Sequence, residues 1–164
     1  MKAVLISIQP KWCELIASGQ KTIEVRKTKP KLETPFNVYI YCTKGETVYL
    51  PKDIFGNEAL NGKVIGEFVC DDIADYTIDP YGHHSYFISD DDFENTCLTF
   101  YEELWDYGKG KTLYGWHISD LVIYDKPREL SNFKCAEYNY GRIHLPPRPI
   151  ARVPQSWMYV EVQR

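Results

Sequence analysis

The chain has 164 residues and a mass of 19.2 kDa, and 44% of its residues are hydrophobic while 26% are charged. These proportions predict one soluble domain that is large enough to bury a hydrophobic core. Its apolar runs fall short of the roughly 20 residues that span a bilayer, and the apolar start of the chain is too short for a signal peptide, so we expect no membrane partner and a cytoplasmic location. The five cysteines form no CxxC pair, so we expect reduced thiols, no metal site and no cofactor.

The net charge of −4 is unevenly distributed. Residues 1–34 carry seven Lys or Arg against three Asp or Glu, and residues 107–164 carry nine against five. Residues 67–106 carry twelve acidic residues and no Lys or Arg. An anionic ligand is therefore expected at the surface that the two terminal segments build. The acidic segment is either a solvated face or a docking face for a basic partner.

The start of the chain predicts a strand, a helix and a second strand. Residues 3–8 form a β-branched run, and apolar residues at helical spacing follow between Pro10, which suits the first helical position, and Gly19, which suits the stop. Residues 21–27 then alternate polar and apolar side chains, as a half-buried strand does. Its solvent-facing side is expected to carry Thr22, Glu24 and Arg26.

The rest of the chain adds strands and short helices without a regular order. Strands are predicted over residues 37–42, 62–71, 113–124, with a bend near Ser119 and Asp120, and 156–162. A capping-box pattern at residues 99–102 predicts a helix over residues 100–107. Loops are expected over residues 28–35, 48–61, 76–84 and from residue 126 onward. Because strands and helices do not alternate regularly, the pattern favours an α+β domain or a small open barrel over a doubly wound parallel fold.

No Walker loop, HExxH, GxSxG or zinc-spaced cluster is present, so the candidate chemistry lies in residues 21–27. This short stretch places an ammonium at Lys21, a hydroxyl at Thr22, a carboxylate at Glu24 and a guanidinium at Arg26. An ammonium can polarise or attack a carbonyl, a carboxylate can move a proton, and a guanidinium can clamp a phosphate. The alternative is that Glu24 and Arg26 only pair with neighbours across the sheet.

Two segments near the N-terminus resemble a known family. The sequences SIQPKW at residues 7–12 and IASGQKTIEVR at residues 16–26 are similar to the ASCH domain signature, in which a helix ending in Gly-x-Lys-Thr leads into a strand ending in Arg. The segments YGWHIS at residues 114–119 and PQSW at residues 154–157 resemble the ends of larger ASCH proteins from phages and bacteria. The resemblance implies one ASCH domain over residues 1–164, with a PUA-like small β-barrel, short helices at its openings, and insertions around residues 44–61 and 76–110.

The resemblance also implies a cleft for RNA or a modified nucleoside, bordered by the Gly-x-Lys-Thr segment. Some ASCH proteins are similar to amidohydrolases that remove the acetyl group from acetylated cytidine with a catalytic Lys, Thr and Glu, and others are described as ribonucleases or RNA binders. Lys21 matches the catalytic lysine, but Glu24 stands where the hydrolases carry their threonine. The catalytic candidates are Lys21, Glu24 and Thr22. The distal glutamate has three unranked candidates, namely Glu94, Glu102 and Glu103.

Ligand-binding candidates are aromatic and basic. A base stacked on an aromatic ring gains roughly 1–3 kcal/mol, although large aromatic residues also fill the cores of small domains. Trp12 is the first aromatic candidate because it begins the helix that delivers Lys21. The full set of ligand-binding candidates is Trp12, Arg26, Lys27, Tyr41, Trp116 and His117. The leading hypothesis is a module that binds RNA or a nucleotide, and the alternatives are an amidohydrolase acting on an acylated nucleoside, a ribonuclease and an acidic interaction protein.

Overall fold

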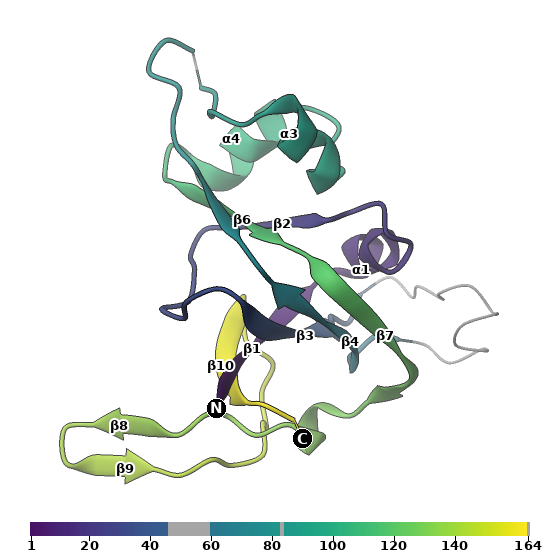
Figure 1. Ribbon diagram of the computed structural model, residues 1–164, viewed down its shortest axis with the longest axis vertical. Coiled ribbons are helices and arrows are strands. Elements are labelled where there is room, and N and C mark those ends of the chain that lie inside the picture. The colour runs from purple at the N-terminus through teal and green to yellow at the C-terminus, as the bar shows by residue number, and fades with distance from the viewer. Residues whose placement is uncertain (46–59, 83, 164) are drawn as a thin grey trace.

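A computed structural model describes residues 1–45, 60–82 and 84–163, and the chain has a mixed α+β fold (Figure 1). Most of the excursion expected at residues 48–61 and most of the insertion expected at residues 44–61 lie outside these described residues. A five-stranded sheet has the order β10-β1-β3-β4-β7. Its strands are β1 (Lys2–Ile8), β3 (Phe36–Cys42), β4 (Lys63–Cys70), β7 (Ser119–Arg128) and β10 (Trp157–Glu161).

The first strand lies inside this sheet, between the edge strand β10 and β3. β1 pairs in parallel with β3 and antiparallel with β10, so the strands nearest the two ends of the chain are neighbours (Figure 1). A strand with partners on both sides and side chains packed on both faces must be apolar throughout. The β-branched run predicted at residues 3–8 fits this position, because every residue from Ala3 to Ile8 is buried.

A smaller sheet of order β2-β6-β5 contains β2 (Ile23–Arg26), β6 (Leu113–His117) and β5 (Ile73–Tyr76), and β8 (Tyr138–Tyr140) pairs with β9 (Ile143–Leu145) in a separate hairpin. The long strand predicted over residues 113–124 is thus divided: β6 belongs to one sheet and β7 to the other. The chain changes sheets between His117 and Ser119, and Asp120, the second residue of β7, has a φ of 45° that interrupts the extended conformation. The expected bend near Ser119 and Asp120 is confirmed.

The sheets of the described residues do not close into a barrel. β7 and β10 lie at opposite edges of the five-stranded sheet and do not pair with each other. The structure therefore confirms the α+β class but does not confirm the expected PUA-like small β-barrel, because the edge strands remain separate.

Helices α3 (Asp90–Thr96) and α4 (Glu102–Gly108) pack near the smaller sheet, at one end of the molecule (Figure 1). The helix predicted at residues 100–107 corresponds to α4, while α3 is an addition. The predicted capping box is corrected by one residue. Glu103, rather than Glu102, accepts hydrogen bonds from the backbone N–H groups of Thr99 and Phe100, both at 2.8 Å.

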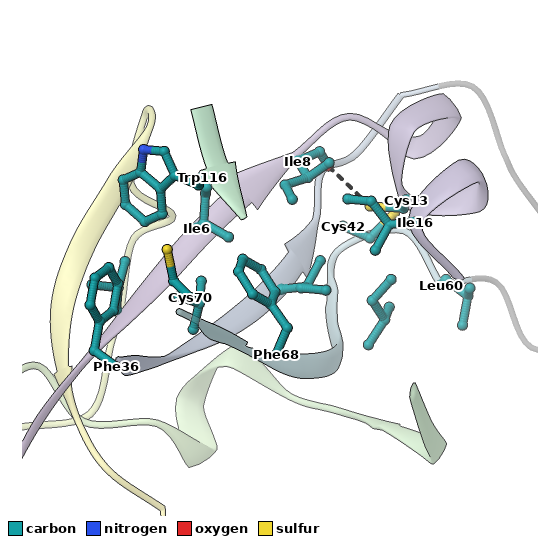
Figure 2. Close-up of a cluster of buried hydrophobic side chains, with 14 residues drawn as sticks. Ile6, Ile8, Cys13, Ile16, Phe36, Cys42, Leu60, Phe68, Cys70 and Trp116 are labelled. Carbon is teal, nitrogen blue, oxygen red and sulfur yellow. Dashed lines mark hydrogen bonds between the residues drawn. The ribbon is translucent and has the colours of Figure 1, made fainter. Parts of the chain in front are cut away.

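The main hydrophobic core lies between the five-stranded sheet, helix α1 (Pro10–Ala17) and strand β6 (Figure 2). Cys13 and Ile16 fill one end of this core from α1, and Phe36 meets Trp116 edge-on at the other, with 5.9 Å between ring centroids. Trp116 is fully buried. No described helix has the length and apolar character needed to cross a membrane.

Candidate functional site

The turn after α1 carries Lys21 into the interior of the protein. Gly19 adopts a φ of 80°, a left-handed conformation that glycine tolerates, and the backbone N–H groups of Gln20 and Lys21 both donate to the Leu15 carbonyl at 3.0 Å. The Lys21 residue is only 3% exposed. Its ammonium donates to the backbone carbonyls of Ile23 and Thr96, both at 2.8 Å. Because Thr96 ends α3, Lys21 ties this helix to β2.

A carboxylate lies between Lys21 and Arg26. Glu24 Oε2 is 3.3 Å from Lys21 Nζ, and Glu24 Oε1 is 2.9 Å from an Arg26 guanidinium nitrogen and accepts a hydrogen bond from Arg26 Nε at 3.1 Å. The rest of the guanidinium donates to the Ser7 carbonyl at 2.6 Å and to Ser156 Oγ at 3.3 Å. The polar face of β2 is therefore buried, and Glu24 and Arg26 pair with each other instead of pairing across the sheet.

One oxygen of this cluster has no hydrogen-bond donor among the described residues. Glu24 Oε2 is buried and accepts no hydrogen bond, although it lies close to the Lys21 ammonium. A buried polar atom without a partner destabilises a protein, so such atoms are uncommon and often mark functional positions. The Glu24 carboxylate thus keeps acceptor capacity for a donor from outside the protein chain.

The Lys21, Glu24 and Arg26 side chains border a cavity of about 580 Å³. Its walls come from the end of β1, the start of α1, β2, the end of β3, α4 with the residues before it, and the segment before β10. The lining residues are Ser7, Gln9, Trp12, Lys21, Glu24, Val25, Arg26, Thr43, Leu98, Glu103, Leu104, Tyr107, Pro154 and Gln155. A volume of this size is within the range of about 300–1,000 Å³ that is typical of small-molecule sites.

Two aromatic residues stand on the cavity walls. The Trp12 ring centroid is 4.8 Å from Lys21 Nζ and 4.5 Å from Nζ of the exposed Lys11. Tyr107 lines the α4 wall, and Lys27 Nζ lies 4.7 Å from its ring centroid. Burial raises the pKa of the Tyr107 hydroxyl, which therefore stays protonated and able to donate a hydrogen bond. Lys27 itself is exposed at the rim and does not line the cavity.

The structure brings some of the predicted site residues together and separates others. Lys21, Glu24, Arg26 and Trp12 share the cavity. Thr22 lies outside it, and its backbone bonds instead to Asn95 and Ile118.

Three aromatic or imidazole candidates lie outside the cavity. Tyr41 and Trp116 are 3% and 0% exposed in hydrophobic clusters, so neither offers a face to a ligand. His117 is on the surface beside Asp71, with 3.3 Å between Nδ1 and the carboxylate, and does not line the cavity. Large aromatic side chains in strands of a small domain are used for packing here.

Other lining residues were not predicted as site residues. Four of them lie in segments that resemble the ASCH family: Ser7 and Gln9 in SIQPKW, and Pro154 and Gln155 in PQSW. This resemblance is the signal in the sequence that could have indicated them. Tyr107 has no such signal. Of the three candidate distal glutamates, only Glu103 lines the cavity, and its Oε2 caps α4.

The chain was compared with known proteins. The sequence model of the ASCH domain matches residues 6–104, which is more than half of the chain. Among curated proteins, none matches the sequence.

Solved structures of ASCH from Zymomonas mobilis share the fold. The crystal structure of the Zymomonas mobilis protein aligns with the present chain with a TM-score of 0.52 and 20% identity. The alignment covers 78% of the present chain and 73% of the Zymomonas mobilis chain. A serine-to-alanine mutant of the same protein aligns with a TM-score of 0.59 and 17% identity, covering 97% and 88%. The family match and the shared fold lead to one conclusion: the chain belongs to the ASCH domain family.

Proposed function

We propose that the protein binds a single RNA base or nucleoside in the cavity bordered by Lys21, Glu24 and Arg26. The observation that carries this proposal is the buried Glu24 Oε2, which lacks a hydrogen-bond donor beside the aromatic wall of Trp12. A base edge presents N–H donors, and its π face packs on an aromatic ring. RNA binding is also associated with ASCH domains in general.

The charges of the cavity favour a base over a phosphate. Arg26 already bonds to Glu24, Ser7 and Ser156, so its guanidinium has little capacity left for a phosphate. Lys21 is held by two backbone carbonyls and by the Glu24 carboxylate. We therefore assign recognition of the base to Glu24 and Trp12, with Tyr107 of α4 as a further donor. Lys27, which is exposed beside Tyr107, is placed to meet a phosphate at the rim.

Hydrolysis of an acylated nucleoside is the second candidate, because Lys21 Nζ and the Glu24 carboxylate are 3.3 Å apart at the cavity. In this alternative Lys21 polarises the substrate carbonyl electrostatically, since its ammonium donates to the Ile23 and Thr96 carbonyls and is ion-paired with Glu24. Glu24 carries the proton between water and the leaving amine.

Calorimetric titration of the four ribonucleosides and of an acetylated cytidine tests the proposal, with chromatography of each mixture to detect hydrolysis. Trp12→Ala is expected to weaken nucleoside binding by about 1–3 kcal/mol through loss of stacking. Tyr81→Ala, which removes an aromatic ring that is 93% exposed and outside the cavity, is the matched control. Absence of binding by the wild type, or equal binding by Trp12→Ala and the control, overturns the proposal. Turnover that is lost in Lys21→Ala would favour the hydrolase.

A further inference from the structure

The β8–β9 hairpin exposes an apolar face that nothing in the described chain covers. In Figure 1 it projects from the body of the molecule, away from α3 and α4. Tyr138 lies opposite Leu145 and Tyr140 opposite Ile143, so these four side chains share one face, and they are between 41% and 69% exposed. An isolated two-stranded ribbon is marginally stable in water, and an apolar face on it indicates a partner.

The same region is strongly basic. Residues 134–152 carry Lys134, Arg142, Arg148 and Arg152 against a single acid, Glu137. All four cationic residues are exposed, and none of them forms an ion pair with a carboxylate of the described residues. Their charges are therefore available to an anion from outside the protein.

The basic region is continuous with the wall of the cavity. From β9 the chain passes Arg148 and Arg152 and reaches Pro154 and Gln155, which line the cavity. The Cys135 N–H donates to the Arg148 carbonyl at 2.9 Å, and this bond fixes the returning segment against the start of the hairpin region. This path along the chain thus joins the tyrosines of the hairpin, Arg148 and Arg152, and the cavity wall.

We propose that this path, formed by the β8–β9 hairpin and residues 146–153, binds a single-stranded RNA. The base adjacent to the bound stretch of RNA then occupies the cavity. The proposal extends the proposed function and rests on it. Arginines meet the phosphates, and Tyr138 and Tyr140 provide rings on which unpaired bases stack. This combination of clustered arginine and exposed tyrosine suits a single strand better than a second copy of the acidic chain, because a copy supplies carboxylates but no stack of planar bases.

Fluorescence anisotropy of a labelled RNA of about 20 nucleotides tests the proposal. The triple variant Arg142→Ala, Arg148→Ala, Arg152→Ala is compared with a control that removes equal charge elsewhere, Lys109→Ala, Lys111→Ala, Lys126→Ala. Each lost phosphate contact lowers the affinity for a single strand by roughly fivefold near 0.1 M salt, so the arginine variant is expected to bind about 100-fold more weakly. The slope of log affinity against log salt is expected to fall by about 2. Tyr140→Ala is expected to weaken binding by about fivefold or more.

Equal RNA affinity in the two triple variants overturns the inference. The inference is also overturned if sedimentation shows a changed oligomeric state of the arginine variant while its RNA affinity is unchanged. That result would mean that the hairpin contacts a second copy of the chain. Nucleoside titration separates this inference from the proposed function. If nucleosides bind through Trp12 while the arginines prove irrelevant to RNA, only the path is wrong. If RNA depends on the arginines while no nucleoside binds, only the cavity is wrong.

Discussion

Lys21, Glu24 and Arg26 neutralise one another inside the protein. Glu24 contacts both cations, and its side chain is only 8% exposed. Removal of a central buried carboxylate leaves two cations without a counter-charge, and this is far more costly than loss of an ion pair at the surface. The cluster is therefore a structural junction between β2, β1 and α3.

Glu24→Ala is expected to lower the free energy of unfolding by about 3–5 kcal/mol, because Lys21 and Arg26 remain buried without their counter-ion. Urea unfolding followed by tryptophan fluorescence measures the change. Glu33→Ala, which removes an exposed carboxylate, is the control and is expected to stay within about 0.5 kcal/mol of the wild type. A Glu24→Ala protein as stable as the control would contradict the charge arrangement described here.

The burial of the cysteines predicts which of them react with a thiol reagent. Burial raises the pKa of Cys70 to about 12, so its thiol stays protonated and unreactive near neutral pH. Cys97 and Cys135 are partly exposed. Treatment of the native protein with iodoacetamide at about pH 8 is expected to label Cys97 and Cys135 and to spare Cys70, as read by peptide mass spectrometry. Rapid labelling of Cys70 would show that it is not buried in solution.

The sequence was sufficient to predict that the polar residues of β2 share one face of a strand, but not that they are buried. Alternation over residues 21–27 correctly placed Glu24 and Arg26 on one face of a strand. It also implied that this face meets solvent, which is wrong. The covering residues, among them Leu104 and Pro154, come from distant parts of the chain and have no local signal in the segment itself.

At the scale of elements, α4 forms one wall of the cavity and depends on Glu103. The Glu103 carboxylate accepts hydrogen bonds from two backbone N–H groups that precede the helix. Leu104 and Tyr107, on the same helix, line the cavity. The position of this wall is thus coupled to a single helix cap.

Glu103→Ala is expected to destabilise the protein by about 1 kcal/mol, as loss of a helix cap does. Because the same change loosens the wall that carries Tyr107, we also expect weaker nucleoside binding. Glu102→Ala removes the neighbouring exposed carboxylate and tests whether charge alone is responsible. Calorimetry and thermal unfolding of both variants provide the comparison, and identical behaviour would exclude the capping role.

Most strands were predictable because apolar runs and alternation are local properties. Helix α3 was not, since its sequence DDDFENT has no apolar periodicity. Its signals are Ser89, whose side chain accepts a hydrogen bond from the Asp92 N–H, and three acidic residues in the first turn, where the helix dipole favours them. Whether the sheets close into a barrel could not be predicted either, because closure depends on pairing between edge strands that are far apart in the sequence.

In the whole molecule, the charge segregation counted along the sequence becomes a partial separation in space, because Lys21 and Lys27 of the basic N-terminal segment still contact α3 and α4. The acidic helices α3 and α4 lie at one end, and the basic hairpin region lies at the other (Figure 1). An anionic polymer is therefore attracted to one end only. The electrostatic potential of the two ends has little effect on a neutral nucleoside, because the cations of the cavity are already paired with Glu24.

This difference predicts opposite responses to salt. Between about 50 and 300 mM salt, the affinity for a single-stranded RNA is expected to fall steeply, because counterions are released from each contacted phosphate. Nucleoside affinity over the same range is expected to change by less than about twofold, because no net charge is bound. Calorimetry and anisotropy on one preparation measure both. A nucleoside affinity as salt-sensitive as that of RNA would show that the cavity binds through free charge.

Under the proposed function, a base packs against Trp12 and donates a hydrogen bond to Glu24 Oε2. A crystal structure of the protein with a bound nucleoside tests it most directly. The base is expected against the Trp12 ring, with an N–H nitrogen at a hydrogen-bonding distance of about 2.7–3.2 Å from Glu24 Oε2. A nucleoside bound elsewhere, or an empty cavity at a saturating nucleoside concentration, would contradict the account.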